Sequence, residues 1–355
     1  MSEDQTARRK AEHLRIVIEE DVQHRTGPLL DDVRLLHQAV PELALEEIDT
    51  SSQLFGKPLA APLMVTSMTG GAERTGSLNR ELAGVAARAG IAFAVGSQRP
   101  MLERRSRAAD FAVRPAIPDG VLLGNLGGAQ VAEVPVEAVV RLVREIEADG
   151  LCVHLNPAQE LVQPEGNRSF RGQLDGIARL CDALDGRVMV KETGAGLAPE
   201  TLARLHSIGV SCVDVAGSGG TSWTRVELLR APSGPLQRLG QALADWGVPT
   251  AVSTIAARRV LGEGGTVVAS GGIASGLDCA RAIAAGASLC GFARAVLMAW
   301  HRGGTEGASE FVESLRGELR AAMLLTGART VAELGRVPRV YTGALREWLV
   351  GLGYL

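Results

Sequence analysis

Eight short apolar runs, each ending in glycine or polar residues, constrain the fold of this 355-residue chain more than any other feature. Most are continuously apolar, a pattern typical of parallel strands covered on both faces. A helix-like segment has room to follow each run, and eight strand-plus-helix units predict an α/β fold, the (β/α)8 TIM barrel. The runs are 62–68, 92–97, 121–126, 151–156, 187–192, 212–217, 266–272 and 288–293.

Helix candidates lie between these runs. They occupy 78–89, 135–148, 199–207 and 277–285, and each closes at a glycine, as helices commonly do. A ninth apolar run, 249–255, predicts the beginning of a helix between the sixth and seventh strands. The alternative, a doubly wound sheet, usually has about six strands and a GxGxxG motif after the first. Here the first strand ends in MTGG without that motif, which favours the barrel.

The two ends of the chain are predicted as extensions of a single barrel domain. Residues 1–60 precede the barrel and contain a helix-like segment, Ala7–Asp21. The barrel itself is expected to span 61–300. Residues 301–355 follow it and contain a second helix candidate, Ser309–Leu325.

Charge and composition limit the classes of partner that this chain can bind. Lys and Arg number 37 against 40 Asp and Glu, a balance that argues against nucleic acid or an anionic membrane surface as a partner. Four Trp, two Tyr and six Phe are too few for a base-stacking platform. The chain begins without an apolar signal segment, and the most apolar stretch, 282–293, is too short to cross a bilayer. Five cysteines without a CxxC motif predict buried thiols in a reducing cytoplasm.

In this fold the chemistry gathers at the carboxyl ends of the strands. The loop Gly271–Ile273, followed by Ser275 and Gly276, predicts open backbone N–H groups at a helix N-terminus, which is an anion site. Ala293 and Arg294 add a second helix start and a cation at the neighbouring strand end. We therefore expect a phosphate group there, against the alternative that these are ordinary turn glycines.

Other strand-end residues allow both functional and structural interpretations. Lys191 either faces the barrel mouth, as an anion partner, base or Schiff-base amine, or is an exposed strand end. Glu160 in the run HLNPAQE is a candidate Mg²⁺ ligand, although a lone Glu is more often a surface residue. His13 follows Lys10 and Arg9 at helical spacing, which forms either a diphosphate grip or a solvated face. Trp223 is either a loop anchor or a lid.

Taken together, these segments resemble the type 2, flavin-dependent isopentenyl-diphosphate isomerases. The resemblance runs from about Arg9 to the C-terminal helix. It depends on RKAEH (9–13), MTGG (68–71), GSQR (96–99), NLG (125–127), HLNPAQE (154–160), VKE (190–192), DVAGSGGTSW (214–223) and ASGGI (269–273).

The resemblance implies an FMN-dependent isomerase of isoprenoid biosynthesis. It would interconvert isopentenyl and dimethylallyl diphosphate with reduced FMN, NADPH as reductant and Mg²⁺, as a homo-oligomer, a tetramer or octamer. The implied FMN contacts are Thr66, Ser67, Met68, Thr69, Ser97, Asn125, Lys191, Ser218, Thr221, Gly271, Gly272, Ile273, Ala293 and Arg294. The implied diphosphate contacts are Arg9, Lys10, His13, Ser97, Gln98, Arg99 and Gln159. His154, Asn156 and Gln159 would serve catalysis, and Glu160 would bind Mg²⁺.

Two departures and two alternatives accompany the resemblance. Ala274 stands where many relatives carry Arg, which would leave more of the phosphate binding to Arg294 and backbone amides. KETGAG (191–196) also differs from the usual form. An FMN-dependent 2-hydroxy-acid oxidase or dehydrogenase shares this barrel type but needs a late His–Arg pair. A non-catalytic phosphate-binding barrel is the other alternative. The sequence leaves open whether the flavin or Gln159 exchanges the proton.

Overall fold

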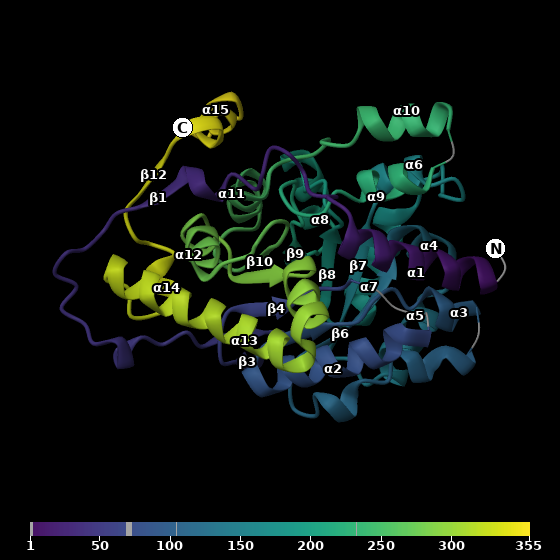
Figure 1. Ribbon diagram of the computed structural model, residues 1–355, viewed down its shortest axis with the longest axis horizontal. Coiled ribbons are helices and arrows are strands. Elements are labelled where there is room, and N and C mark those ends of the chain that lie inside the picture. The colour runs from purple at the N-terminus through teal and green to yellow at the C-terminus, as the bar shows by residue number, and fades with distance from the viewer. Residues whose placement is uncertain (1–2, 69–72, 104, 232) are drawn as a thin grey trace.

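The computed structural model describes residues 3–68, 73–103, 105–231 and 233–355. Eight parallel strands close into a barrel in the order β10-β11-β4-β5-β6-β7-β8-β9, which confirms the predicted (β/α)8 fold (Figure 1). Each of the eight predicted runs overlaps one barrel strand, and β6 and β7 extend one residue beyond their runs. The strands are β4 (Leu63–Val65), β5 (Ala92–Ala94), β6 (Leu122–Gly127), β7 (Gly150–Leu155), β8 (Val188–Glu192), β9 (Cys212–Asp214), β10 (Thr266–Ala269) and β11 (Leu289–Phe292).

Helices cover the outside of the barrel. The prediction for 199–207 matches α8 (Pro199–Ser207), and the run at 249–255 does begin a helix, α11 (Thr250–Leu261). The segment predicted at 135–148 holds a shorter helix, α5 (Val136–Glu145). The other helices around the barrel are α2 (Glu73–Ala89), α3 (Arg99–Glu103), α4 (Gly128–Glu133), α6 (Pro157–Val162), α7 (Gln173–Ala183), α9 (Trp223–Arg230), α10 (Pro235–Ala242) and α12 (Gly276–Ala284).

The interior of the barrel is apolar at the amino ends of the strands. Alternate residues of a strand face the same side, so every second residue points inward. The inward residues form one apolar cluster, which a short hairpin of β2 (Ser52–Leu54) and β3 (Lys57–Leu59) closes from below. Its members are Leu54, Leu59, Met64, Ala92, Ala94, Val121, Leu123, Cys152, Met189, Cys212, Val268 and Leu289, with Phe55 packed against them.

Two residues farther along the same strands, the inward positions become polar. By the same alternation Thr66 follows Met64, Asn125 follows Leu123, and His154 follows Cys152 in the barrel interior. Lys191, Asp214 and Ser270 continue this layer on the three strands that follow. At the carboxyl ends of the strands, the barrel interior is therefore a ring of polar side chains directly above the apolar cluster.

The extensions pack on the barrel and contain elements that the sequence did not reveal. The N-terminal helix α1 (Glu3–Glu19) contacts α9 and the long helix α13 (Arg294–Thr326). Strand β1 (Val33–Leu35) pairs antiparallel with β12 (Arg339–Tyr341), which brings the two extensions together (Figure 1). The short helices α14 (Val331–Leu334) and α15 (Gly343–Gly351) flank β12.

The helix predicted at 309–325 is part of a longer element. Helix α13 (Arg294–Thr326) begins directly after the eighth strand and is interrupted only at Gly303 and Gly304, whose backbone is not helical. None of the described helices combines the length and the apolar character that a membrane crossing requires.

Candidate active site

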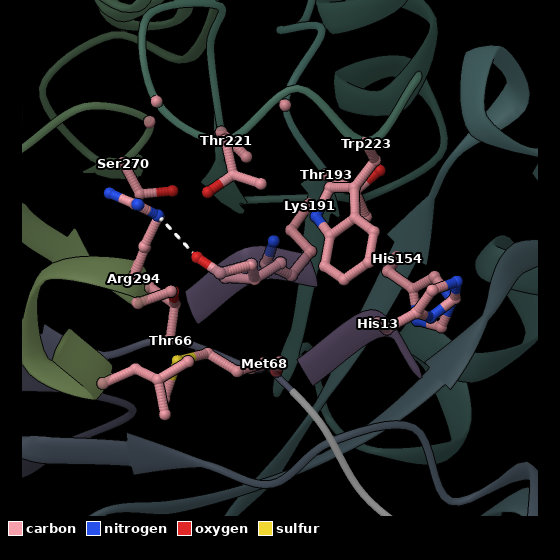
Figure 2. A pocket seen from close by; sticks show the side chains of 18 of the residues that line it. His13, Thr66, Met68, His154, Lys191, Thr193, Thr221, Trp223, Ser270 and Arg294 are labelled. Atoms are coloured by element: carbon pink, nitrogen blue, oxygen red, sulfur yellow. Dashed lines mark hydrogen bonds between the residues drawn. The ribbon is translucent and has the colours of Figure 1, made fainter. Parts of the chain in front are cut away.

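A cavity of about 610 Å³ opens at the carboxyl ends of the strands, above the polar layer. Figure 2 shows His13, His154 and Trp223 gathered on one side of it and Ser270 and Arg294 on the other, with Lys191 between them. Most residues predicted for the site line this cavity. They are Arg9, Lys10, His13, Thr66, Ser67, Met68, Ser97, Arg99, Asn125, His154, Asn156, Gln159, Glu160, Lys191, Thr221, Gly271, Gly272, Ile273, Ala293 and Arg294.

Helix α1 carries three of the cationic or titratable side chains across the cavity. Arg9, Lys10 and His13 all line it, as their helical spacing predicts. Two contacts fix this helix from the barrel side. Arg294 donates from Nε to the carbonyl oxygen of Val17 at 2.9 Å, the dashed line in Figure 2. The ring of His13 meets Trp223 edge to face, with centroids 5.2 Å apart.

A buried carboxylate, Glu227 on α9, joins α1 to the strand-end loops. Its Oε1 lies 2.8 Å from Nε2 of His13 and accepts from Nε2 of Gln159 at 3.0 Å. Arg230 pairs with its other oxygen and also with Glu12 on α1 at 2.9 Å. Burial alone would raise the pKa of Glu227, but its bonds and charges from His13, Arg230 and Gln159 outweigh burial, and the pKa lies below its ordinary value.

A chain of amides holds His154. Gln98 is fully buried; it accepts from the backbone N–H of Asn125 at 3.0 Å and donates to the carbonyl oxygen of Leu142 at 3.2 Å. Asn125 Oδ1 in turn lies 2.9 Å from Nδ1 of His154. Burial, with the charges of Lys191 and Lys10, lowers the pKa of His154 to about 3. This imidazole is therefore neutral at ordinary pH.

The loop after β10 comes close to the loop after β9. Gly271 and Gly272 have φ values of 100° and 89°, a region that favours glycine, and a Cβ on either would overlap a carbonyl oxygen, of Gly217 or Gly219. Thr250, at the start of α11, donates to the carbonyl oxygen of Gly271 at 2.5 Å and fixes the loop from behind. The result is a tight backbone turn at the cavity wall, packed against the loop after β9.

The prediction that the start of α12 offers open N–H groups to an anion is wrong. The N–H groups of Ala274 and Ser275 donate to a carboxylate oxygen of Asp278, at 3.1 and 2.9 Å. The N–H of Gly276 donates to Glu318 at 2.6 Å. The sequence pattern did not reveal these internal caps, which leave the start of α12 already satisfied. The cavity reaches instead Gly271–Ile273 and the first turn of α13, where the leading N–H groups of a helix have no intrahelical partner.

Comparison with known proteins decides which FMN-type barrel this is. The family model for FMN-dependent dehydrogenases matches residues 119–339. The isopentenyl-diphosphate delta-isomerase of Halobacterium salinarum is 44% identical over 97% of this chain and 96% of its own length. That of Pyrococcus horikoshii is 38% identical over 99% of this chain and 96% of its own. The chain belongs to the FMN-dependent, type 2 isopentenyl-diphosphate delta-isomerase family.

Solved structures agree with the fold of this isomerase family member. A lactate oxidase from Pediococcus acidilactici superposes with a TM-score of 0.69 at 15% identity, covering 96% of this chain and 93% of the oxidase. A mandelate oxidase variant with an FMN monooxide adduct gives 0.67 at 19%, covering 96% and 99%. At these identities the likeness shows the shared barrel fold alone. The sequence relatives support the isomerase over the 2-hydroxy-acid oxidase.

The residues present fit FMN, the cofactor of this isomerase family. Gly271 and Gly272 line the cavity beside the start of α13, and glycine lets the backbone approach a phosphate closely there. Lys191 supplies a cation at the cavity floor, only 6% exposed. The hydroxyl oxygen of Ser67 is buried without a hydrogen-bond partner among the described residues. Such an orphaned polar group on a cavity wall is what a bound polar ligand would satisfy.

Three expected FMN or substrate contacts are not placed in the cavity. Gln98 lies behind Asn125 and acts through it, so we do not retain it as a substrate contact. Ser218 is buried, and its backbone pairs with Val248 and Thr250 rather than facing the cavity. Thr69 falls outside the described residues.

Sequence reasoning missed two carboxylates of this site. Asp214 was visible as a charged residue inside an apolar strand run, a position that requires a partner. Glu227 had no comparable signal, because its partners His13 and Gln159 come from α1 and α6, far away in the chain, and only Arg230 is near it in sequence. Only the folded arrangement brings them together.

Proposed function

We propose that this chain interconverts isopentenyl and dimethylallyl diphosphate by proton addition and elimination in isoprenoid biosynthesis, using reduced FMN. The observation that supports this most is one cavity with two separate anion-binding regions. The backbone at Gly271–Gly272 and the first turn of α13, which both line the cavity, suit the phosphate of FMN. The cationic face of α1, with Arg9 and Lys10, suits a substrate diphosphate.

The protein itself offers little acid–base chemistry at the centre of the cavity. His154 is neutral, since burial holds its pKa at about 3. Gln159 donates to Glu227 and accepts from Asn156 at 3.2 Å, so its amide is fixed in one orientation. An amide in two hydrogen bonds orients a substrate better than it moves a proton. When bound, reduced FMN would supply the proton-exchanging ring beside the alkene.

Under this proposal the protein residues bind, orient and enclose the substrate. Residues 1–60 contribute through α1, whose Arg9, Lys10 and His13 would hold the diphosphate together with Ser97 and Arg99. His154, Asn156 and Gln159 would line the pocket for the hydrocarbon. Trp223, in its T-shaped contact with His13, would cover that pocket.

We propose Glu160 as the protein ligand of Mg²⁺. It lines the cavity, and its carboxylate already accepts from Asn156 Nδ2 at 3.1 Å and from the N–H of Asn167. The described residues contain no group of three His, Cys, Asp or Glu side chains placed to hold a metal. Mg²⁺ would therefore depend on substrate phosphate and water for its other ligands, as it often does.

The remaining proposals concern the setting of the enzyme. NADPH would reduce the flavin, the location would be cytoplasmic, and the chain would form a tetramer or octamer. The five cysteines are all buried and unpaired, which is typical of a reducing compartment. Family likeness supports the reductant and the assembly.

The decisive experiment is anaerobic incubation with FMN, NADPH, Mg²⁺ and isopentenyl diphosphate, followed by product analysis. We expect dimethylallyl diphosphate, and none when the flavin stays oxidised. A matched control omits NADPH and reduces FMN with dithionite, which separates flavin reduction from the choice of reductant. Oxidation of a 2-hydroxy acid without isomerisation would favour the oxidase alternative, and the absence of both activities would contradict an enzymatic role.

A further inference from the structure

Lys191 and Asp214 face each other across two neighbouring strands at the cavity floor. They are register partners on β8 and β9, and both point into the barrel, because each lies two residues after a member of the interior apolar cluster. Asp214 is fully buried, whereas Lys191 reaches the cavity. The carboxylate thus lies beneath the ammonium, on the side away from the ligand.

The contacts of Asp214 are unequal. Its Oδ1 accepts from the hydroxyl of Ser270 at 2.5 Å and from the N–H of Ala216 at 3.2 Å. Its Oδ2 lies 3.7 Å from Nζ of Lys191 and has no hydrogen-bond partner among the described residues. Lys191 donates instead to the carbonyl oxygen of Glu192 at 2.6 Å. The two groups therefore interact through charge rather than through a short bond, and the ammonium keeps donors for the cavity.

Glu192, the next residue on β8, also interacts with Lys191 by charge; burial raises its pKa to about 7, and its Oε2 accepts from the backbone N–H groups of Thr193, Gly194 and Ala195. Burial raises the pKa of Cys152 to about 12, so its thiol stays neutral. His154 is neutral, and Lys10 from α1 adds positive charge on the cavity side. Asp214 is thus the described inward-facing carboxylate that lowers the positive potential at the cavity floor, because Glu192 follows Lys191 directly on β8 and points out of the barrel.

We propose that Asp214 is a positioning residue that limits the charge Lys191 presents to the FMN ring, and so sets the relative affinity of the site for reduced and oxidised FMN. The inference requires FMN as the cofactor, the premise it shares with the proposed function. A reduced flavin ring that has lost a proton is anionic, so an uncompensated Lys191 would favour it. In a buried site with little water such a charge acts strongly.

The test compares FMN binding in D214N and in the wild type. Dissociation constants are measured anaerobically for oxidised and reduced FMN, together with the midpoint potential of the complex. We expect D214N to shift the ratio of the two constants about tenfold toward reduced FMN, which for a two-electron couple is about 30 mV. D149N is the matched control: it removes a carboxylate that pairs with Lys57 at 2.7 Å, outside the active-site cavity, and should leave the ratio unchanged.

A double substitution separates the proposed role from a general structural one. In a K191M background the D214N shift should be smaller than in the wild type, because the substitution then removes only the direct field of the carboxylate and no longer changes the charge or position of the ammonium. An unchanged ratio in D214N, or a shift of the same size with K191M as in the wild type, overturns the proposal. D214S, which leaves room for water, replaces D214N if that variant does not fold. If the wild-type protein binds no FMN, the premise that FMN is the cofactor fails. This outcome is seen before any variant is made, so it is distinct from a failure of the Asp214 proposal.

Discussion

The two ends of one barrel interior differ within two residues of the same strands. At the amino ends, Leu123, Met189 and Cys212 fill the barrel with apolar side chains that are almost completely buried. At the carboxyl ends, Asn125, Lys191 and Asp214 replace them with polar and charged groups. On one strand, an inward residue near the amino end thus contributes to stability, and the next inward residue contributes to ligand binding. The comparison predicts that substitutions at the two ends separate the two properties.

The largest effect is expected at the apolar end. Leu123→Ala removes a fully buried side chain from the closed part of the barrel. The lost burial and the cavity left behind should lower the free energy of unfolding by about 2–5 kcal/mol. Chemical denaturation measures this, while fluorescence titration should show an FMN dissociation constant close to that of the wild type. A large loss of FMN affinity at unchanged stability would contradict the division between the two ends.

Lys191→Ala is the counterpart at the polar end. Removing the buried cation should raise the dissociation constant of FMN about 10- to 100-fold, because a charged hydrogen-bond donor contributes about 1.5–3 kcal/mol. The readout is FMN retention during purification and titration of the apoprotein. Lys57→Ala, at the hairpin that closes the opposite end, is the control and should bind FMN normally. A fully yellow, active Lys191→Ala protein would refute this role for the lysine.

The N-terminal helix extends the polar end and should affect substrate rather than cofactor. Arg9→Ala combined with Lys10→Ala is expected to raise KM for isopentenyl diphosphate about tenfold or more, since two charge-assisted contacts are lost. FMN affinity should change little. Arg15→Ala on the same helix removes only an exposed pair with Glu19 and serves as the control. Unchanged steady-state kinetics in the double variant would exclude α1 from diphosphate binding.

A smaller change is expected at Glu160, the candidate metal ligand. Glu160→Gln keeps the size of the side chain but removes its charge, so the Mg²⁺ concentration needed for half-maximal activity should rise several-fold. A Mg²⁺ titration of initial rates measures this. Glu165→Gln is the neighbouring control, because that carboxylate pairs with Arg9 and Arg230 instead. Identical titrations for Glu160→Gln and the wild type would exclude Glu160 from metal binding.

The sequence was sufficient for the barrel and for most cavity residues, because apolar runs and strand-end motifs are local patterns. It was insufficient where a residue's function depends on partners distant in the chain. Asp278 and Glu318 cap the helix start that the glycine pattern marked as an open anion site. Gln98 lies within a recognisable motif, yet its side chain supports Asn125 from behind. Side-chain direction and long-range partners are properties of packing, which spacing alone does not determine.

The polar end should also make stability depend on pH. The pKa of His154 is about 3 in the folded protein and about 6.5 in an unfolded chain, so the unfolded state binds more protons between these values. The contribution of neutral His154 to stability is complete above pH 6.5. It is lost as the pH falls toward 3, by at most about 1.4 kcal/mol for each pH unit. His154→Gln, which retains a partner for Asn125, should flatten this slope in FMN-free protein.

Denaturation of both proteins at a series of pH values between 4 and 7 measures the difference in slope. Glu192 makes stability depend on pH in the opposite sense, because burial raises its pKa to about 7 in the folded protein. Its ionisation therefore reduces stability as the pH rises from about 4.5 to 7, but it is present in both proteins and cancels in their difference. Parallel curves would mean that His154 is hydrated and titrates normally. Burial of His154 would then carry no electrostatic cost to stability. At this residue, the two ends of the barrel would differ in packing alone.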